Sequence, residues 1–124
     1  STALLANNYN KGVDAYKSGD YKTAVALWKP YATDGNVNAQ YDIARIFYEG
    51  TGVEQKYHKA LYWYKKAAEQ EHAKSLIRIG LMDCKGEGVL KSFKKAVPYV
   101  QLASDNGCTK APEVWAKYEL WKYE

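Results

Sequence analysis

The sequence contains few of the residues from which metal sites and covalent cross-links are built. Only two cysteines and two histidines occur, and two cysteines are too few for a disulfide framework. Three prolines in 124 residues leave long stretches free to form helices, because proline disrupts a helix interior. No apolar run approaches the roughly 20 residues that a membrane-spanning helix requires. We therefore expect an all-α protein with no membrane span and no structural metal or disulfide scaffold.

Charge of one sign is also not concentrated anywhere along the chain. The 18 Lys and Arg residues are interleaved with 14 Asp and Glu residues, for a net charge of +4. A nucleic-acid-binding protein gathers its Lys and Arg on one face or along one helix. We therefore expect no nucleic-acid partner and interpret the charges mainly as a well-solvated surface.

What the sequence does have is aromatic residues with a polar edge. There are 12 Tyr and 4 Trp but only 2 Phe. Such side chains are typical of surfaces that are half-buried or that contact a partner. At this length the chain is expected to form one domain, residues 1–124.

A repeat of 36 residues runs through the chain. Shifting the segment from Gly50 by this step aligns Gly50 with Gly86, Val53 with Val89 and Ala60 with Ala96. The same step backwards aligns Ala24 with Ala60. A fixed register of this length is the signature of a repeat protein. We divide the chain into three units, approximately 3–36, 37–72 and 73–108, followed by a terminal segment at 109–124.

Each unit has the pattern of two helices joined by a turn. Gly50 and Gly86 are expected to end a helix, because glycine tolerates the positive φ of that position. Asp20 and Ser92 are expected to cap the start of the helix that follows each of them. In the last helix, apolar residues at helical spacing should share one face, and the sequence indicates a single capping helix there: Ala111, Val114, Trp115, Tyr118 and Trp121. The expected helices lie near 3–18, 21–33, 37–49, 57–70, 73–85, 92–106 and 110–122.

These motifs resemble the Sel-1-like repeat family, a relative of the tetratricopeptide repeat. The family pattern is A-x-x-x-L-G-x-x-Y-x-x-G-x-G-V followed by K-A-x-x-W-Y-x-K-A-A. The middle unit reads AQYDIARIFYEGTGV and KALYWYKKAAEQ, and the third reads SLIRIGLMDCKGEGV and KAVPYVQLASDNG. Asp83 departs from the pattern, standing where the preceding unit has Phe47, and Pro98 stands inside an expected helix, where a kink is predicted. The resemblance implies an α/α solenoid of about three helical hairpins with a C-terminal capping helix.

The resemblance also implies a function, which is a non-catalytic scaffold or adaptor that binds a peptide or protein in a concave groove. In relatives, the first helix of each unit lines this groove. Tyrosine and arginine, which are frequent at interaction hot spots, are prominent in the first two units. Ile77 and Leu81 in the third unit have an equally good alternative, which is packing under the C-terminal helix. The expected partner-binding residues are Tyr9, Val13, Tyr16, Asn38, Tyr41, Arg45, Tyr48, Ile77 and Leu81.

Catalytic, cofactor and metal sites are not expected. The GTGV and GEGV segments lack the Lys-Ser/Thr pair and the strand context of a phosphate loop. His72 and Cys108 occupy equivalent positions of neighbouring repeats, too far apart to share a zinc ion, and His58 is interpreted as a solvated loop residue. Cys84 and Cys108 are expected to be free, because parallel first helices would separate them by far more than the roughly 7 Å that a disulfide allows.

Two further hypotheses stay open. The basic, tyrosine-rich surface could bind an anionic polymer, or a cell-wall or saccharide fragment whose rings stack on tyrosine. By analogy with relatives of this size, we expect a bacterial, periplasmic or secreted protein, with the cytoplasm as the alternative. A monomer is the favoured oligomeric state.

Overall fold

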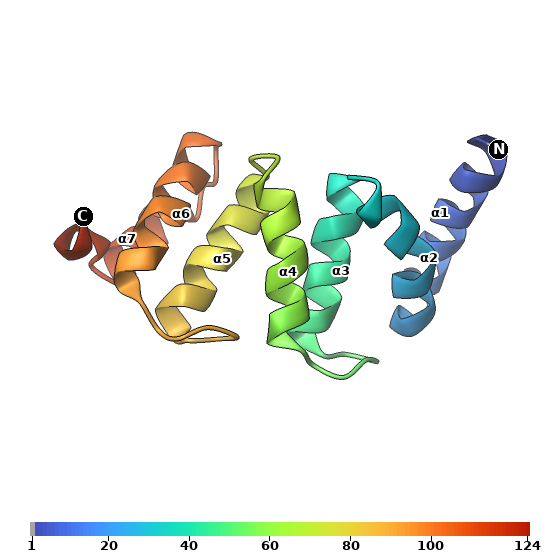
Figure 1. Ribbon diagram of the computed structural model, residues 1–124, viewed down its shortest axis with the longest axis horizontal. Helices are drawn as coiled ribbons and strands as arrows, with labels where there is room; N and C mark the ends of the chain where they lie inside the picture. Colours follow the sequence, from blue (N-terminus) through green and yellow to red (C-terminus); the bar gives the residue numbers. More distant parts are fainter. Residues whose placement is uncertain (1) are drawn as a thin grey trace. The chain divides into compact units, whose positions relative to one another are not determined.

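The computed structural model describes residues 2–124, and within them the secondary structure is helical (Figure 1). The expected helix positions are confirmed to within two residues except at the C-terminal end. The described residues form seven α-helices and one 3₁₀ helix, η1: α1 (Thr2–Lys17), α2 (Tyr21–Thr33), α3 (Val37–Glu49), α4 (Tyr57–Ala68), α5 (Ala73–Lys85), α6 (Phe93–Asp105), α7 (Ala111–Lys117) and η1 (Leu120–Tyr123). The all-α prediction is thus confirmed.

Side chains and glycines at the helix ends explain these boundaries. The Asp20 carboxylate accepts a hydrogen bond from the Thr23 backbone N–H at 3.2 Å, and the Ser92 hydroxyl accepts one from Lys95 at 3.1 Å. These caps satisfy backbone donors that the first helical turn leaves unpaired. Gly50 and Gly86 end α3 and α5 in the left-handed conformation, with φ of 67° and 72°. All four predicted boundary roles are confirmed.

The chain divides into two compact units, Ser1–Trp63 and Tyr64–Glu124, and the boundary falls inside α4. In the first unit, α1 packs on α2 and α2 packs on α3. Small residues allow the helices to approach, and Trp28 fills the space between them. The buried core of this unit includes Ala24, Trp28, Ala32, Ala39, Ile43 and Ile46.

In the second unit, α5 and α6 form a hairpin that α7 and η1 cover from the α6 side. Gly80 lies at the point of closest approach, since a Cβ built there would lie 2.8 Å from Cγ2 of Val100. The core of this unit includes Leu76, Ile77, Val100, Val114 and Leu120. Both cysteines are free, Cys84 buried and Cys108 half-buried.

The expected single C-terminal helix at 110–122 is wrong. Helix α7 ends at Lys117, Glu119 adopts a left-handed conformation with φ of 53°, and the chain resumes as a 3₁₀ helix. The left-handed residue rotates the chain that follows it. The residue that turns toward the core is therefore one position earlier than a continuous helix would place it. As a result Leu120 is fully buried, while Trp121, expected on the apolar face, is 51% exposed.

Helix α6 continues through Pro98, whose ring is exposed. A proline at this position lacks the N–H that would bond the carbonyl four residues earlier, in the first turn of the helix. The helix nevertheless runs without interruption from Phe93 to Asp105, so Pro98 removes one hydrogen bond without ending the helix, and the kink expected there stays a prediction.

Asp83 introduces a carboxyl into the interior of the second unit. Its side chain is only 5% exposed, and burial raises the pKa of its carboxyl above the ordinary value. Lys65 of α4 and Lys95 of α6 oppose this shift by attraction. The Asp83 charge in turn contributes, after burial, to the raised pKa of Tyr99, and burial raises the pKa of the Cys84 thiol to about 11. The core of the second unit therefore contains a carboxyl group at the position where the preceding repeat has the Phe47 ring.

We predict that Asp83→Asn stabilises the protein more at neutral pH than in acid. A carboxyl whose pKa is raised by folding binds its proton more tightly in the folded state. Its contribution therefore favours folding below the ordinary carboxyl pKa and is lost as the pH rises through the raised folded value. Urea unfolding of both proteins from pH 3.5 to 7.5 checks this, because groups common to both cancel in the difference. A difference in the free energy of unfolding that stays constant with pH would contradict the prediction.

Candidate functional site

The predicted binding residues of the first two units lie on α1 and α3, within the first compact unit. Tyr9, Tyr16, Tyr41, Arg45 and Tyr48 are all half-buried, as is Val13, and Asn38 is exposed. On α3, Tyr41, Arg45 and Tyr48 are spaced by four and three residues, so they share one face of the helix. We call the set formed by Tyr9, Val13, Tyr16, Tyr41, Asp42, Arg45 and Tyr48 the Tyr–Arg surface.

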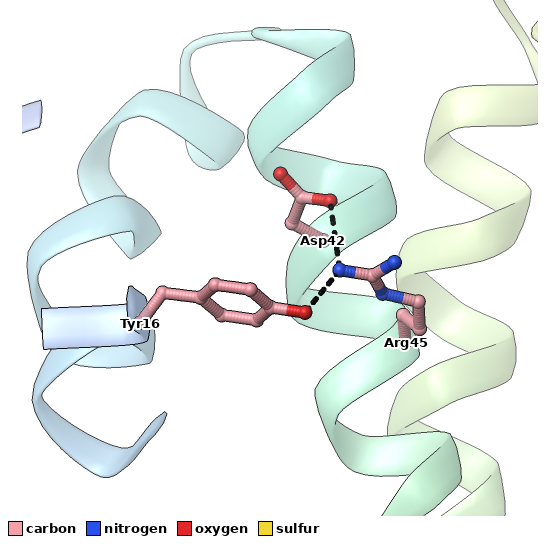
Figure 2. Close-up of polar contacts among 3 residues, drawn as sticks. All are labelled: Tyr16, Asp42 and Arg45. Atoms are coloured by element: carbon pink, nitrogen blue, oxygen red, sulfur yellow. Dashed lines mark hydrogen bonds and ion pairs between the residues drawn. The ribbon is translucent and has the colours of Figure 1, made fainter. Parts of the chain in front are cut away.

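Arg45 is the centre of this surface (Figure 2). Its Nη2 atom donates a hydrogen bond to the Tyr16 hydroxyl on α1 and lies 3.9 Å from the Asp42 carboxylate one turn earlier on α3. The guanidinium carbon also lies 5.4 Å from the centre of the Tyr16 ring and 5.9 Å from that of Tyr41. The Arg45 side chain is 31% exposed, so it is held in place and still reaches solvent. A guanidinium positioned in this way can donate to a carbonyl or carboxylate of a partner.

Tyr9 and Tyr16 are supported from beneath by Trp28. Their ring centres lie 5.9 Å and 5.8 Å from that of Trp28, and the Trp28 indole N–H donates to the Tyr9 carbonyl at 3.2 Å. Tyr9 further meets Tyr31 edge to face, at 5.2 Å. Burial, and next the nearby Asp42 carboxylate, raise the pKa of the Tyr9 hydroxyl. The rings therefore have fixed positions, and the Tyr9 hydroxyl stays protonated and able to donate.

Tyr48 lies at the C-terminal end of the α3 part of the surface, and the predicted binding residue Asn38, which is exposed, is not part of that surface. The Tyr48 ring lies 5.4 Å from the Tyr57 ring, and its carbonyl accepts a hydrogen bond from the Gln55 amide at 2.8 Å. Tyr48 thus holds the glycine-containing turn against α3, while Asn38 stands in solvent.

Ile77 and Leu81 pack against the C-terminal helix, which was the alternative to a binding role. Ile77 is 5% exposed and belongs to the core of the second unit with Ala111 and Val114, and Leu81 packs against that same core. Ile77 is therefore not available to a partner, and the half-buried Leu81 is engaged with the same core. We therefore leave both residues out of the Tyr–Arg surface.

Sequence reasoning missed Asp42, which adds a negative charge to the surface and helps to orient Arg45. Its spacing of three residues from Arg45 on one helix was an available signal for an ion pair. His58 is exposed as expected, but it lies in the first turn of α4 rather than in a loop, and it lines a cleft described below.

Among residues 2–124 no group of three or more His, Cys, Asp or Glu side chains is placed to hold a metal ion. Within the same residues, no helix is both long and apolar enough to cross a membrane.

Comparison with known proteins places these features in a family. A family model described as Sel1 repeat matches residues 37–72 and 73–108. The chain belongs to the Sel1 repeat family. Such repeats commonly mediate protein interactions, and domains of this family are typically non-catalytic.

Three solved structures share the fold. A Sel1 repeat protein from Oxalobacter formigenes is 28% identical, with a TM-score of 0.76 over 86% of this chain and 46% of that chain. A protective antigen of uropathogenic Escherichia coli strains, described as displaying an SLR fold, is 24% identical, with a TM-score of 0.81 over 93% of this chain and 26% of that chain. Cysteine rich protein B of Helicobacter pylori is 18% identical, with a TM-score of 0.72, covering 89% of this chain and 93% of that one. The predicted α/α solenoid of paired helical hairpins is thereby confirmed.

The curated relatives of this Sel1 repeat chain are much longer proteins. Chitin synthase regulatory factor 3 of Schizosaccharomyces pombe is 31% identical over 121 residues, which is 96% of this chain and 13% of that protein. The ERAD-associated E3 ubiquitin-protein ligase component HRD3A of Arabidopsis thaliana is 30% identical over 80 residues, or 64% of this chain and 12% of that protein. The chain thus spans about an eighth of the length of either relative.

Proposed function

We propose that this Sel1 repeat chain is a non-catalytic scaffold that binds a peptide or protein partner on the Tyr–Arg surface. The observation that carries the proposal is Arg45, fixed by Tyr16 and Asp42 and flanked by two tyrosine rings, yet 31% exposed. A side chain ordered before binding loses less conformational entropy when the partner arrives. Tyrosine and arginine are also the residue types that contribute most at interaction hot spots.

The chemistry of the surface favours an extended peptide. Tyrosine hydroxyls donate and accept hydrogen bonds, and the guanidinium offers several donors to backbone carbonyls or to a carboxylate. The names of the two curated relatives, a regulatory factor and a ligase component, are in keeping with a protein-binding role. Placement in the periplasm or outside the cell stays a prediction.

The two alternatives have less support. The Asp42 carboxylate beside Arg45 would repel a polyanion at the centre of the surface. Trp28 lies against both Tyr9 and Tyr16, which leaves fewer ring faces on which a sugar could stack.

Selection of a random peptide library on the wild-type chain tests the proposal. We expect Tyr41→Ala and Arg45→Gln each to weaken the selected peptides about ten-fold, the size typical of a hot-spot residue. Arg78→Gln is the matched control, because Arg78 is the other arginine of the chain and lies on α5 in the second unit. Circular dichroism confirms that each variant is folded.

Peptides that bind wild type, Tyr41→Ala and Arg45→Gln equally well would place the binding site elsewhere. A steep fall of affinity with salt, regardless of peptide sequence, would instead support the anionic-polymer alternative.

A further inference from the structure

A second surface of the first unit has a composition unlike that of the Tyr–Arg surface. It is a cleft of about 640 Å³ between α2 and the beginning of α4, with α3 as its floor. This volume lies within the range of ordinary ligand pockets. We call it the α2–α4 cleft.

The cleft faces away from the Tyr–Arg surface. Its floor includes Phe47, two residues after Arg45 on α3. Two residues of an α-helix correspond to a rotation of about 200°. A partner on the Tyr–Arg surface would therefore leave the α2–α4 cleft accessible.

Apolar and aromatic groups form the floor and one wall of the cleft. Phe47 and Trp63 are half-buried, and Tyr62 is 54% exposed. The Tyr62 and Trp63 rings meet edge to face at 5.0 Å. An exposed aromatic wall above a partly buried aromatic floor is suited to holding an apolar side chain.

Basic groups surround this floor. Lys29 comes from α2, while His58 and Lys59 come from α4, and all three are exposed. The Lys59 ammonium lies 5.2 Å from the centre of the Phe47 ring, which keeps its charge at the edge of the apolar floor. None of the nine lining residues is Asp or Glu. The cleft therefore combines apolar contact with positive charge that no lining carboxylate offsets.

We propose that the α2–α4 cleft binds a short acidic peptide segment, with one apolar side chain of that segment on the Phe47 floor and flanking Asp or Glu residues beside Lys29 and Lys59. Charge complementarity argues for this occupant, since a cleft edged by cations and free of lining carboxylates selects against basic and neutral segments. The volume of about 640 Å³ lies in the range of pockets that hold drug-sized ligands, which is enough for a short segment. This site is independent of the Tyr–Arg surface, because the two share no residue.

An acetylated and amidated peptide with one Leu flanked on each side by two Glu residues is the probe. Its titration is followed by the ¹⁵N–¹H spectrum of the full chain. We expect the largest shifts at Lys59, Tyr62 and the Trp63 indole N–H. A peptide with Gln in place of every Glu, and one with Ser in place of Leu, should each bind at least five-fold more weakly.

Variants then distinguish binding in the cleft from general electrostatic attraction of an acidic peptide to a basic protein. Each of Lys29→Gln and Lys59→Gln should weaken binding of the Leu-containing acidic peptide about three-fold, and the pair about ten-fold, as for exposed ion pairs. Tyr62→Ala should weaken it without affecting the fold, since this side chain is largely exposed. Lys22→Gln is the matched control, an exposed lysine on the same helix as Lys29 but outside the lining.

Three outcomes would overturn the proposal. One is an effect of Lys22→Gln as large as that of Lys59→Gln. Another is a set of shifts centred on Tyr41 and Arg45, which would move the peptide to the Tyr–Arg surface. The third is failure of the peptide to bind while phosphatidylserine vesicles bind in a manner dependent on Lys59 and Tyr62, which would assign the cleft to a lipid surface.

Discussion

Replacing Trp28 with alanine is expected to lower the free energy of unfolding by about 3–5 kcal/mol. A loss of this size is a large share of the 5–15 kcal/mol that typically separates folded from unfolded domains. Trp28 is 3% exposed and lies in the core of the first unit. Its removal leaves a cavity between α1 and α2, because helix backbones cannot move together by the thickness of an indole ring without losing their other contacts.

The close fit of α1 against Trp28 makes this position sensitive. A Cβ built on Gly12 of α1 would lie 2.4 Å from Nε1 of Trp28, so the helix backbone itself contacts the indole. The indole N–H also donates to the Tyr9 carbonyl. Trp28→Ala should therefore weaken peptide binding on the Tyr–Arg surface as well, since Tyr9 and Tyr16 lose the ring that supports them.

Urea unfolding followed by circular dichroism at 222 nm measures the effect without relying on tryptophan fluorescence. Trp121→Ala is the control, because it deletes the same side chain from a position that is 51% exposed. We expect the control to change the free energy of unfolding by less than about 1 kcal/mol. Similar losses for both variants would show that burial of Trp28 does not determine its contribution.

Features with local causes could be predicted from the sequence. The ends of α3 and α5 follow from glycines that tolerate positive φ, and the starts of α2 and α6 follow from Asp20 and Ser92, whose side chains bond the backbone three residues on. Each of these interactions lies within a few residues of sequence. A single repeat unit therefore contains the information needed to place its own helices.

Features that depend on contacts between helices could not be predicted in the same way. The hydrogen bond between Tyr16 and Arg45 joins residues 29 positions apart, and their pairing depends on how α1 and α3 both pack against α2. The break at Glu119 was missed for a related reason, since the expected stripe placed Trp121 in the core. In the structure Leu120 is buried instead, which requires a left-handed residue before it. A prediction from helical periodicity assumes that every residue is right-handed and therefore misses it.

The α2–α4 cleft could not be predicted from the sequence either. Lys29 and Lys59 are far apart in sequence and have no motif in common. In the sequence, His58 has only the pattern of a polar residue near a turn. Only the packing of α2 and α4 over Phe47 brings these groups to one cleft. Helical periodicity identifies the face that each helix buries, but not the residues from two helices that meet above that face.

Gly50→Ala is expected to have the second-largest effect. It should lower the free energy of unfolding by about 2–5 kcal/mol. Gly50 has a φ of 67°, and a residue with a side chain pays about 1–2 kcal/mol for this left-handed conformation. The added Cβ would also lie 2.5 Å from Cβ of Gln55 and 3.0 Å from its Cα, as the chain turns back toward α4. Relief of that clash requires a backbone shift, which adds about 1–3 kcal/mol.

Gly19→Ala separates the two causes. Gly19 has a φ of 85°, but a Cβ built there meets nothing within 4 Å, so only the conformational cost of about 1–2 kcal/mol applies. Gly86 is the residue equivalent to Gly50 in the next repeat. The loss of unfolding free energy for Gly86→Ala should lie between those for Gly50→Ala and Gly19→Ala, since the added Cβ would lie 3.3 Å from Cβ of Lys91. Urea unfolding of the three alanine variants should therefore rank the losses as Gly50, then Gly86, then Gly19. Equal losses would mean that positive φ alone requires glycine after α3, and that the packing of Gln55 against the helix end adds nothing.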